Sequence, residues 1–328
     1  MRVLVTGAAG FIGSSVTDRL LARGDEVIGL DNFNDFYDPA VKRMNVREVE
    51  AKAPPGAKFT LFSHDIVHHK EMIERLIFAD PARRPDAICH LAAWAGVRPS
   101  IEKPMIYQSV NLEGTMNLLE LARRHGIKPF VFASSSSVYG ARTEVPFRED
   151  DRVDDPVSPY AATKKAGELL GFTYHHLFGL RFIGLRFFTV YGPRQRPEMA
   201  IHLFAKKILD GTPVTLYGDG STSRDYTYID DCVSGVVAAI DRASTTDGYR
   251  IYNLGCSATT TLAELVAIIE KATGKSAIID RKPDQPGDVP RTFADVSRAE
   301  AELGYAPTTP VPVGIPKFVT WLETRRRA

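Results

Sequence analysis

The chain has 328 residues, of which 44% are hydrophobic and 25% charged, and its 41 Lys and Arg residues nearly balance 40 Asp and Glu residues. These proportions are typical of a globular protein and exclude a disordered chain, a collagen or a coiled coil. The near-neutral balance argues against a nucleic-acid partner, and no apolar run approaches the roughly 18 residues that a membrane span needs. The three cysteines lie far apart without a CxxC pair, so we expect neither a disulfide framework nor a metal site. The sequence therefore predicts a soluble, cytoplasmic globular protein with no membrane partner.

The first half of the chain alternates strand-like and helix-like segments. Short β-branched runs separated by helices indicate βαβ units and a parallel sheet that is buried on both faces. We therefore predict an α/β fold with a Rossmann-type, doubly wound parallel sheet. Strands are expected at 2–6, 26–30, 59–62, 87–91 and 130–133, and helices at 12–23, 40–52, 69–78 and 107–124.

The character of the sequence changes near Gly192, where prolines become denser and short strands mix with helices. We interpret residues 1–190 as one domain and residues 191–328 as a smaller, mixed α/β lobe. The stretch 217–254 is open to a second interpretation, in which it packs back onto the first domain.

A glycine-rich turn follows the first predicted strand and opens the first predicted helix. Its sequence is Gly7-Ala8-Ala9-Gly10-Phe11-Ile12-Gly13, a GxxGxxG spacing. Glycines in this place allow a tight turn and a close approach of the backbone to a pyrophosphate, while the helix start offers free N–H groups and a positive dipole end. We expect Gly7, Gly10, Phe11, Ile12 and Gly13 to bind a dinucleotide.

Asp31 ends the second predicted strand, 18 residues after the last glycine of the turn. A carboxylate there accepts hydrogen bonds from the adenosine ribose and repels a 2′-phosphate. Asn32 follows it instead of an arginine, which favours NAD over NADP. The alternative is a plain turn-forming Asp-Asn pair. Asp65 and Ile66, after the third strand, are expected to flank the adenine.

Tyr160 and Lys164 stand four residues apart in a predicted helix that Ser158-Pro159 leads in. Residues at this spacing share one helix face. A free tyrosine has a pKa of about 10, too high for a base at neutral pH, and a nearby ammonium group favours the phenolate. The pair predicts a general base that takes the proton of a substrate hydroxyl while hydride leaves the same carbon.

A serine run, Ser134-Ser135-Ser136-Ser137, closes the strand that precedes this helix. It presents hydroxyl groups at the carboxyl edge of the predicted sheet, where ligands bind in parallel α/β folds. A serine run alone is typical of a polar turn. Its combination with the glycine turn and the YxxxK pair, in this order, is a much stronger indication of function than any of the three motifs alone.

With these motifs, the sequence resembles the NAD-dependent nucleotide-sugar epimerases of the extended short-chain dehydrogenase/reductase family, over essentially the whole chain. The resemblance implies that Ser135, Tyr160 and Lys164 are catalytic and that Leu91, Ala92, Ala93 and Asn111 join Tyr160 and Lys164 around a tightly bound NAD that each turnover regenerates. Dehydratases of this family carry Asp-Glu where Ser136 and Ser137 stand here, which argues against water elimination. The further segments that carry the resemblance are His90-Leu91-Ala92-Ala93, Val110-Asn111-Leu112-Glu113-Gly114-Thr115 and Arg224-Asp225-Tyr226-Thr227-Tyr228-Ile229-Asp230-Asp231.

Two segments, 92–100 and 186–200, are most similar to UDP-glucuronate 4-epimerases. That resemblance implies 4-epimerisation of a UDP-sugar through a 4-keto intermediate, an NAD-binding domain, a UDP-sugar-binding lobe and a homodimer that packs through helices near 107–124 and 160–176. Trp94 stands where a polar residue is expected. Pro197 is expected at the first position of a helix, with Arg196 at its entrance. The implied sugar-nucleotide contacts are Arg98, Ser135, Ser136, Ser137, Thr189, Arg196, Met199, Arg224 and Asp288.

Three alternatives stay open: a UDP-glucose-type 4-epimerase, a UDP-glucuronate decarboxylase and a catalytically inactive NAD-binding scaffold or sensor. The intact Ser135, Tyr160 and Lys164 set argues against the last. Oxidation of UDP-glucuronate at C4 makes a β-keto acid, which loses CO₂ when its carboxylate bond aligns with the ketone. We hypothesise that the hydroxyl groups of Ser135–Ser137 and Thr189 hold the carboxylate in an unreactive orientation.

Overall fold

The computed structural model describes residues 1–283 and 289–327, which form two compact units. Unit 1 comprises Met1–Gly140, Arg152–Arg186 and Val233–Tyr252. Unit 2 comprises Ala141–Asp151, Phe187–Cys232 and the described part of Asn253–Ala328. The cofactor and sugar roles expected for the two lobes stay predictions.

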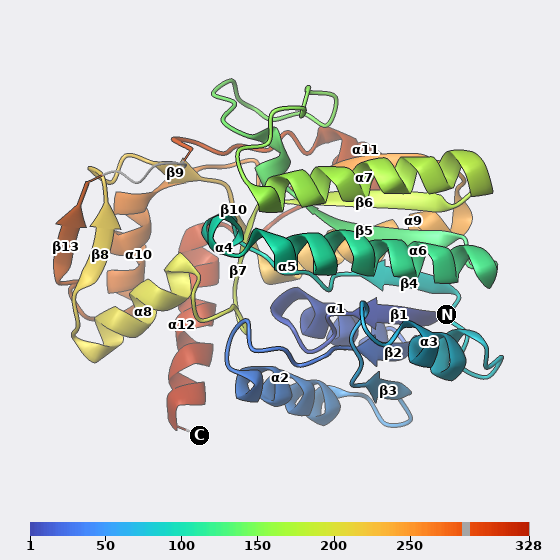
Figure 1. The fold of residues 1–328 in the computed structure, drawn as a ribbon. Coiled ribbons are helices and arrows are strands. Elements are labelled where there is room, and N and C mark those ends of the chain that lie inside the picture. The colour runs from blue at the N-terminus through green and yellow to red at the C-terminus, as the bar shows by residue number, and fades with distance from the viewer. Residues whose placement is uncertain (284–288, 328) are drawn as a thin grey trace. The chain divides into compact units, whose positions relative to one another are not determined.

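A seven-stranded sheet in the order β11-β6-β5-β4-β1-β2-β3 forms the centre of unit 1 (Figure 1). Strand β1 pairs in parallel with β2 on one side and with β4 on the other, so the strand order reverses between β1 and β4. Ligands in doubly wound sheets bind at such a switch point, beyond the carboxyl ends of the strands. The predicted Rossmann-type fold is confirmed. The elements are β1 (Arg2–Thr6), α1 (Phe11–Ala22), β2 (Glu26–Leu30), α2 (Pro39–Lys52), β3 (Phe59–Phe62), α3 (Lys70–Ile73), η1 (Glu74–Phe78), β4 (Ala87–His90), α4 (Val97–Glu102), α5 (Pro104–Gln108), η2 (Ser109–Glu113), α6 (Gly114–Arg124), β5 (Pro129–Ser135), η3 (Ser136–Tyr139), α7 (Pro159–Phe178), β6 (Arg181–Phe187), α9 (Ile229–Thr245) and β11 (Tyr249–Leu254).

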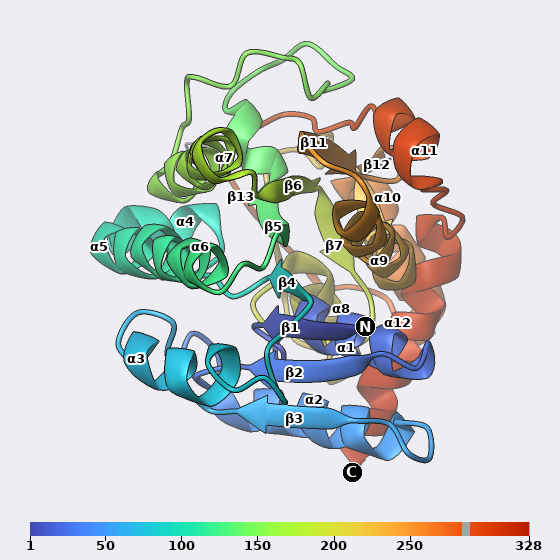
Figure 2. The same cartoon turned by 90° about the vertical axis from the view of Figure 1, so that its right-hand side faces the viewer.

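Helices cover both faces of this sheet. Figure 2 shows α6 and α7 on the opposite side of the strands from α9. The apolar strand residues that the sequence pattern predicts as core are fully buried, among them Leu4, Ile28, Ile88 and Phe130. Helix α7 approaches the sheet closely, because a Cβ atom at Gly167 would lie 2.3 Å from the Phe132 ring. This close approach brings the YxxxK face of α7 to the end of β5.

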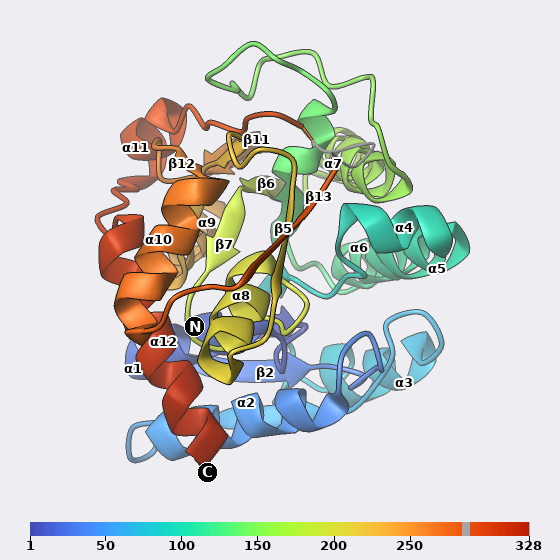
Figure 3. The same ribbon diagram turned by 90° about the vertical axis from the view of Figure 1, so that its left-hand side faces the viewer.

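The described part of unit 2 contains three two-stranded sheets and four helices that lie wholly within it. These helices, α8, α10, α11 and α12, are labelled in Figure 3. β7 and β10 pair in parallel, β13 and β8 pair in parallel, and β12 and β9 pair antiparallel. Helix α10 begins with a capping box, in which Thr261 and Glu264 bond reciprocally to each other's backbone N–H groups. The elements are β7 (Thr189–Tyr191), α8 (Ala200–Asp210), β8 (Val214–Tyr217), β9 (Ser223–Arg224), β10 (Tyr226–Tyr228), β12 (Thr260–Thr261), α10 (Leu262–Thr273), β13 (Ile279–Lys282), α11 (Ser297–Leu303) and α12 (Val311–Arg327).

Three helix predictions need correction. The stretch 69–78 is not one regular helix, because the short helix α3 is followed by a π-helical turn, η1 (Glu74–Phe78). The stretch 107–124 is not one regular helix, because a π-helical turn, η2 (Ser109–Glu113), separates α5 from α6. Helix α8 begins at Ala200 and not at Pro197. The N–H of Met199 donates to the Arg196 carbonyl at 3.2 Å, so Pro197 occupies the second position of a turn, which its fixed φ also suits.

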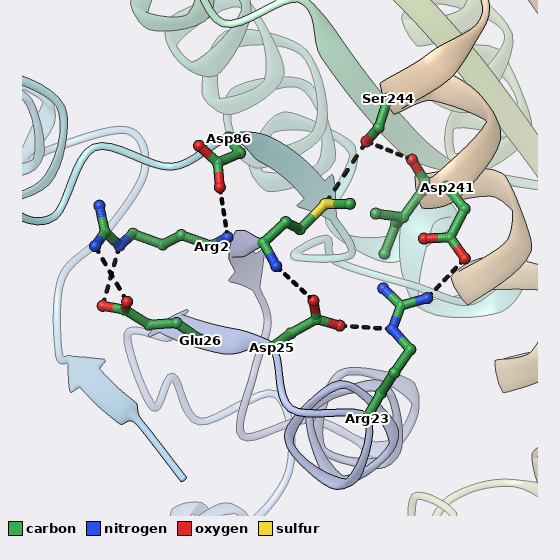
Figure 4. Close-up of polar contacts among 9 residues, drawn as sticks. Arg2, Arg23, Asp25, Glu26, Asp86, Asp241 and Ser244 are labelled. Atoms are coloured by element: carbon green, nitrogen blue, oxygen red, sulfur yellow. Dashed lines mark hydrogen bonds and ion pairs between the residues drawn. The ribbon is translucent and has the colours of Figure 1, made fainter.

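The charged residues at the amino ends of β1 and β2 pair with one another (Figure 4). The Met1 ammonium lies 2.8 Å from Asp25 Oδ1, and Arg23 donates to Asp25 and Asp241 at 2.6 Å each. Arg2 is likewise paired with Glu26. This network joins the end of α1 to α9 at the amino ends of the strands, whereas the glycine turn lies at their carboxyl ends.

Among the described residues, no helix is long and apolar enough to cross a membrane.

Candidate active site

The glycine turn after β1 leaves the start of α1 open for an anion. Gly7 has φ +70°, and a Cβ atom at Gly13 would lie 2.0 Å from the Gly7 carbonyl oxygen. No side chain caps α1 and no acidic residue lies in its first turn. Within the described part of the chain, the N–H groups of Phe11 and Ile12 have no hydrogen-bond partner. These donors and the positive helix end suit a diphosphate.

Asp31, at the end of β2, is fixed beside this turn. Its carboxylate accepts hydrogen bonds from the N–H groups of Ala9 at 3.1 Å and Phe33 at 2.9 Å. Burial raises the pKa of Asp31, while the Lys42 charge and these two N–H groups oppose the rise. The carboxylate is therefore held at the end of β2 beside the glycine turn, and its contact with a ribose stays a prediction.

Asn32 and Asp65 meet at the ends of β2 and β3. The Asn32 side-chain amide donates to Asp65 Oδ2 at 2.6 Å. Burial works against ionisation of Asp65, but the Asn32 amide and the N–H groups of Val67 and His68 outweigh it and lower the pKa of this carboxyl. Ile66 is buried against Gly114. The structure thus brings Asp31, Asn32, Asp65 and Ile66 to one edge of the sheet.

A buried histidine organises the loop after β4. Thr115 Oγ1 donates to the Asn111 carbonyl at 2.6 Å, so it must accept from His90 Nε2 at 2.9 Å. His90 Nδ1 therefore accepts from Thr6 Oγ1 at 2.7 Å. Burial, followed by the Lys164 charge, lowers the pKa of His90 to about 3, which agrees with a neutral ring protonated at Nε2.

Thr6 connects this histidine to predicted cofactor residues. Its hydroxyl oxygen accepts from the N–H groups of Leu91 at 3.2 Å and Ala92 at 3.1 Å. Gly7 packs against the backbone of this segment, since a Cβ atom at Gly7 would be 2.9 Å from the Ala92 nitrogen. The Leu91–Ala93 segment and the glycine turn are therefore adjacent at the switch point.

Asn111 lies in the π-helical turn and binds the same loop two residues further on. Its side chain accepts from the Trp94 N–H and donates to the Trp94 carbonyl, both at 2.9 Å. It also donates to Thr163 Oγ1 at 3.1 Å. Asn111 thus joins the loop after β4 to helix α7, next to Lys164.

Tyr160 and Lys164 lie in the first turns of α7. The helix is well defined there, because Ser158 caps it by accepting from the Ala161 N–H at 3.1 Å and Pro159 occupies its first position. Lys164 Nζ donates to the Ala133 carbonyl at 2.8 Å and lies 5.8 Å from the Tyr160 ring centroid. Burial lowers the pKa of Lys164 to about 7.

Ser135 ends β5 and caps the short helix η3 (Ser136–Tyr139). Its hydroxyl accepts from the Ser137 N–H at 3.1 Å and donates to Ser137 Oγ at 3.2 Å. The bond from Lys164 to Ala133 fixes the same strand two residues earlier. Unit 1 therefore brings the predicted catalytic residues Ser135, Tyr160 and Lys164 to one strand end and the helix beside it.

In unit 2, two predicted substrate residues lie in short strands, Thr189 in β7 and Arg224 in β9. Thr189 begins β7 and stands opposite Tyr226 of β10, and its N–H donates to the Asp225 carbonyl at 3.1 Å. Arg224 immediately precedes Asp225, whose buried carboxylate accepts backbone N–H groups of Cys256, Ser257 and Ala294. Burial, opposed by these bonds, raises the pKa of Asp225 to about 6.

The other predicted substrate residues are more dispersed. Arg196 lies in the turn before α8 and pairs with Glu198 at 3.2 Å, so it is not at a helix entrance as predicted. Met199 is the residue before α8. Arg98 is exposed on α4. Asp288 lies outside the described residues.

Sequence reasoning missed several residues that position the site. Thr6, Thr115 and Thr163 hold His90 and Asn111, and Glu168 binds Ser134. A threonine at the end of a strand or inside a helix carries little signal by itself. In the described part of the chain, no cluster of three or more His, Cys, Asp or Glu side chains could hold a metal ion.

The fold, the glycine turn at the switch point and the Tyr–Lys pair on α7 define a Rossmann-type enzyme. The chain belongs to the NAD dependent epimerase/dehydratase family, whose sequence model matches residues 3–255. UDP-glucuronate 4-epimerase 4 of Arabidopsis thaliana is 45% identical in an alignment 336 residues long with its gaps, which covers 97% of this chain and 74% of that protein. The resemblance predicted from the motifs is confirmed.

Solved structures agree with this assignment. UDP-glucuronic acid 4-epimerase from Bacillus cereus, in complex with UDP-glucuronic acid and NAD, is 35% identical with a TM-score of 0.87, over 99% of this chain and 100% of that one. UDP-glucose 4-epimerase of Thermus thermophilus, in complex with NAD, is 36% identical with a TM-score of 0.85, over 98% and 99% of the two chains.

Proposed function

We propose that the protein is an isomerase that interconverts UDP-glucuronate and UDP-galacturonate by NAD-dependent 4-epimerisation. The observation that carries this proposal is the geometry of Tyr160 and Lys164. The ammonium is held by the Ala133 carbonyl at 2.8 Å and faces the phenol ring from the next helical turn. The names of the relatives and of the complexed structures support the choice of the uronate.

The residues around the glycine turn fit an NAD molecule. The free N–H groups at the start of α1 would bind the diphosphate, and the fixed Asp31 carboxylate would accept the ribose hydroxyls. Asn32, Asp65 and Ile66 would flank the adenine, and Leu91–Ala93 with Asn111 would line the remainder. When bound, NAD supplies an acceptor for the C4 hydride and a donor for its return.

Proton transfer belongs to the side chains of unit 1. Tyr160, as a phenolate, takes the proton of the C4 hydroxyl and later returns it, with Ser135 hydrogen-bonded to the same oxygen. The Lys164 ammonium stabilises the phenolate electrostatically. The 4-keto sugar must turn over between the two half-reactions, so that hydride returns to its opposite face and the configuration at C4 inverts.

The hydroxyl groups of Ser136, Ser137 and Thr189 are proposed to bind the sugar carboxylate. Several fixed neutral donors would keep the C5–carboxylate bond out of alignment with the C4 ketone and so suppress decarboxylation. The double variant Ser136→Ala, Thr189→Ala should release CO₂ and form a UDP-pentose. The absence of any additional CO₂ would contradict this role.

Arginines are proposed to bind the UDP moiety. Arg196 and Arg224 would face the diphosphate of the anionic nucleotide, and Arg98 and Met199 are proposed as further contacts to the UDP-sugar. Asp288 is proposed as a ribose contact on the resemblance alone. The arginines would make the UDP-binding region positively charged, although the chain as a whole is nearly neutral.

We further propose a cytoplasmic homodimer. Helices α6 and α7 border an open hollow lined by Leu112, Met116 and Leu170, and Leu169 and Phe172 are 55% and 51% exposed. A second copy of this chain would bury such an apolar surface. Light scattering of the wild type and of Phe172→Glu should give a dimer and a monomer, respectively.

The decisive experiment is to give the purified protein UDP-glucuronate without added cofactor. We expect UDP-galacturonate and one retained NAD per chain. In a parallel assay with UDP-glucose, conversion of that sugar but not of UDP-glucuronate would indicate a neutral-sugar epimerase. Formation of UDP-xylose with CO₂ from UDP-glucuronate would indicate a decarboxylase. NAD binding without any product, together with an unchanged biological effect of Tyr160→Phe, would identify a scaffold or sensor.

A further inference from the structure

Trp94 is an aromatic residue in a loop where a polar side chain is expected. It lies four residues after β4, it is one of two tryptophans in the chain, and only 8% of its surface is exposed. Asn111 holds its backbone on both sides, at the N–H and at the carbonyl. The backbone of Trp94 is therefore held in place, and its buried indole ring packs against two other aromatic rings.

On one side, the indole contacts the loop that follows Asp31. The rings of Trp94 and Phe36 meet edge to face, with centroids 5.1 Å apart and an interplanar angle of 68°. The loop itself is ordered, because Asn34 accepts from the Phe36 N–H and from Lys42 Nζ. Trp94 therefore contacts a structured segment that begins at the proposed ribose-binding carboxylate.

On the other side, the indole contacts Tyr107 of α5. Their centroids are 6.1 Å apart at an angle of 73°, and the Tyr107 hydroxyl donates to the Ala95 carbonyl at 2.8 Å. Tyr107 in turn meets the ring of Tyr160 edge to face, at 6.1 Å and 78°. A continuous series of edge-to-face contacts thus runs from Phe36 through Trp94 and Tyr107 to Tyr160.

We propose that Trp94 is a positioning residue that joins the ribose-binding loop to the catalytic tyrosine and thereby retains the cofactor. This inference rests on the proposed function, since it assumes that NAD occupies the site between Asp31 and Tyr160. Edge-to-face pairs are attractive and directional, so a single ring that contacts both Phe36 and Tyr107 restrains both ends of the site. A polar side chain at this position lacks the contact with Phe36 and so removes the restraint between this loop and Tyr107.

The test compares NAD affinity with turnover. In Trp94→Gln, we expect the Kd for NAD, measured by calorimetry on protein stripped of nucleotide, to rise about tenfold (1.4 kcal/mol). The retained NAD should fall below one per chain, while kcat at saturating NAD stays within about threefold of the wild type. Trp94→Phe keeps an aromatic edge and should restore the affinity. Trp321→Gln makes the same substitution at the other tryptophan and should leave the NAD affinity unchanged.

A second variant removes the contact from its other side. Phe36→Leu, at a half-buried position, should weaken NAD binding to a similar extent. The double variant should bind NAD no more weakly than Trp94→Gln alone, because both changes break the same contact between Trp94 and Phe36. Additive effects, or wild-type NAD affinity in either single variant, would overturn the inference. Phe36→Leu carries the test by itself if Trp94→Gln fails to fold. A wild type that binds no NAD overturns the proposed function as well, whereas an active wild type with unchanged Trp94→Gln overturns this inference alone.

Discussion

Glu168 on α7 and Arg186 near the end of β6 form a bidentate ion pair, with both N···O distances at 2.9 Å and neither side chain more than 2% exposed. Glu168 also accepts from Ser134 Oγ at 2.6 Å, and Arg186 donates to the Tyr139 hydroxyl at 3.1 Å. Ser134 and Tyr139 flank the Ser135–Ser137 turn. The ion pair therefore stabilises the serine turn by binding a residue on each side of it.

Glu168→Gln should destabilise the protein by about 3 kcal/mol, because the neutral amide leaves the Arg186 charge buried without a counter-ion. The substitution keeps the side-chain volume, so no cavity contributes. Urea unfolding measures the change. Glu144→Gln breaks an ion pair with Arg142 in which the carboxylate side is 81% exposed, and it should cost less than about 1 kcal/mol. Equal effects of the two variants would show that the buried pair has no special role.

Five of the seven strands of the sheet, β1 to β5, could be predicted from the sequence, because each is a short apolar run. Four of these strands are almost wholly buried, whereas β3, at the edge of the sheet, is only partly covered. The glycine turn, Asp31 and the YxxxK pair were also predictable, since each is a local pattern. The π-helical turn at Asn111 was not, because its sequence is compatible with a regular helix. The start of α8 was mispredicted, since proline fits the second position of a turn as well as the first position of a helix.

The long-range contacts of the site could not be predicted either. His90 bonds to Thr6 and Thr115, which are 84 and 25 residues away in sequence. Glu168 binds Ser134 of β5 and Arg186 of β6, which lie in two different strands. Such partners depend on the order of the strands, which no local pattern encodes.

Gly10→Ala and Gly13→Ala should separate cofactor binding from folding. A Cβ atom at Gly10 would meet only the Gly7 carbonyl oxygen, at 3.1 Å, and would otherwise face open space at the start of α1. We expect Gly10→Ala to fold and to bind NAD at least tenfold more weakly, because the methyl group occupies the approach to the free N–H groups. At Gly13, the Cβ atom would lie 2.0 Å from the same oxygen, so Gly13→Ala should lower the thermal midpoint as well. Calorimetry with NAD and thermal unfolding test both, and equal midpoints for the two variants would contradict the expectation.

Tyr160→Phe should lower kcat by about 10²–10⁴-fold, the usual contribution of a positioned general base. The ring and its contact with Tyr107 are kept, so the thermal midpoint and the retained NAD should be unchanged. Tyr249→Phe, on β11, removes the same hydroxyl group away from the YxxxK face and should keep full activity. A Tyr160→Phe variant that converts UDP-glucuronate at the wild-type rate would exclude this tyrosine as the base.

Lys164→Met should make the nucleotide-free protein more stable at neutral pH while abolishing efficient turnover. Burial lowers the pKa of Lys164 to about 7 from its ordinary value of 10.5. The charged lysine therefore costs the folded state about 5 kcal/mol at pH 7 and below. Between pH 7 and 10.5 the unfolded chain binds the proton that the folded chain has released, so this cost declines as the pH rises.

The sign of the effect makes the measurement specific. Thermal midpoints of wild type and Lys164→Met, both stripped of nucleotide, should differ most at pH 7, with the variant higher, and should converge toward pH 10. The lost bond to the Ala133 carbonyl opposes the gain at every pH, so it shifts the difference without changing its slope. A difference that is constant from pH 7 to pH 10 would mean that Lys164 keeps an ordinary pKa in the folded protein, and that the ammonium beside Tyr160 carries no cost of burial.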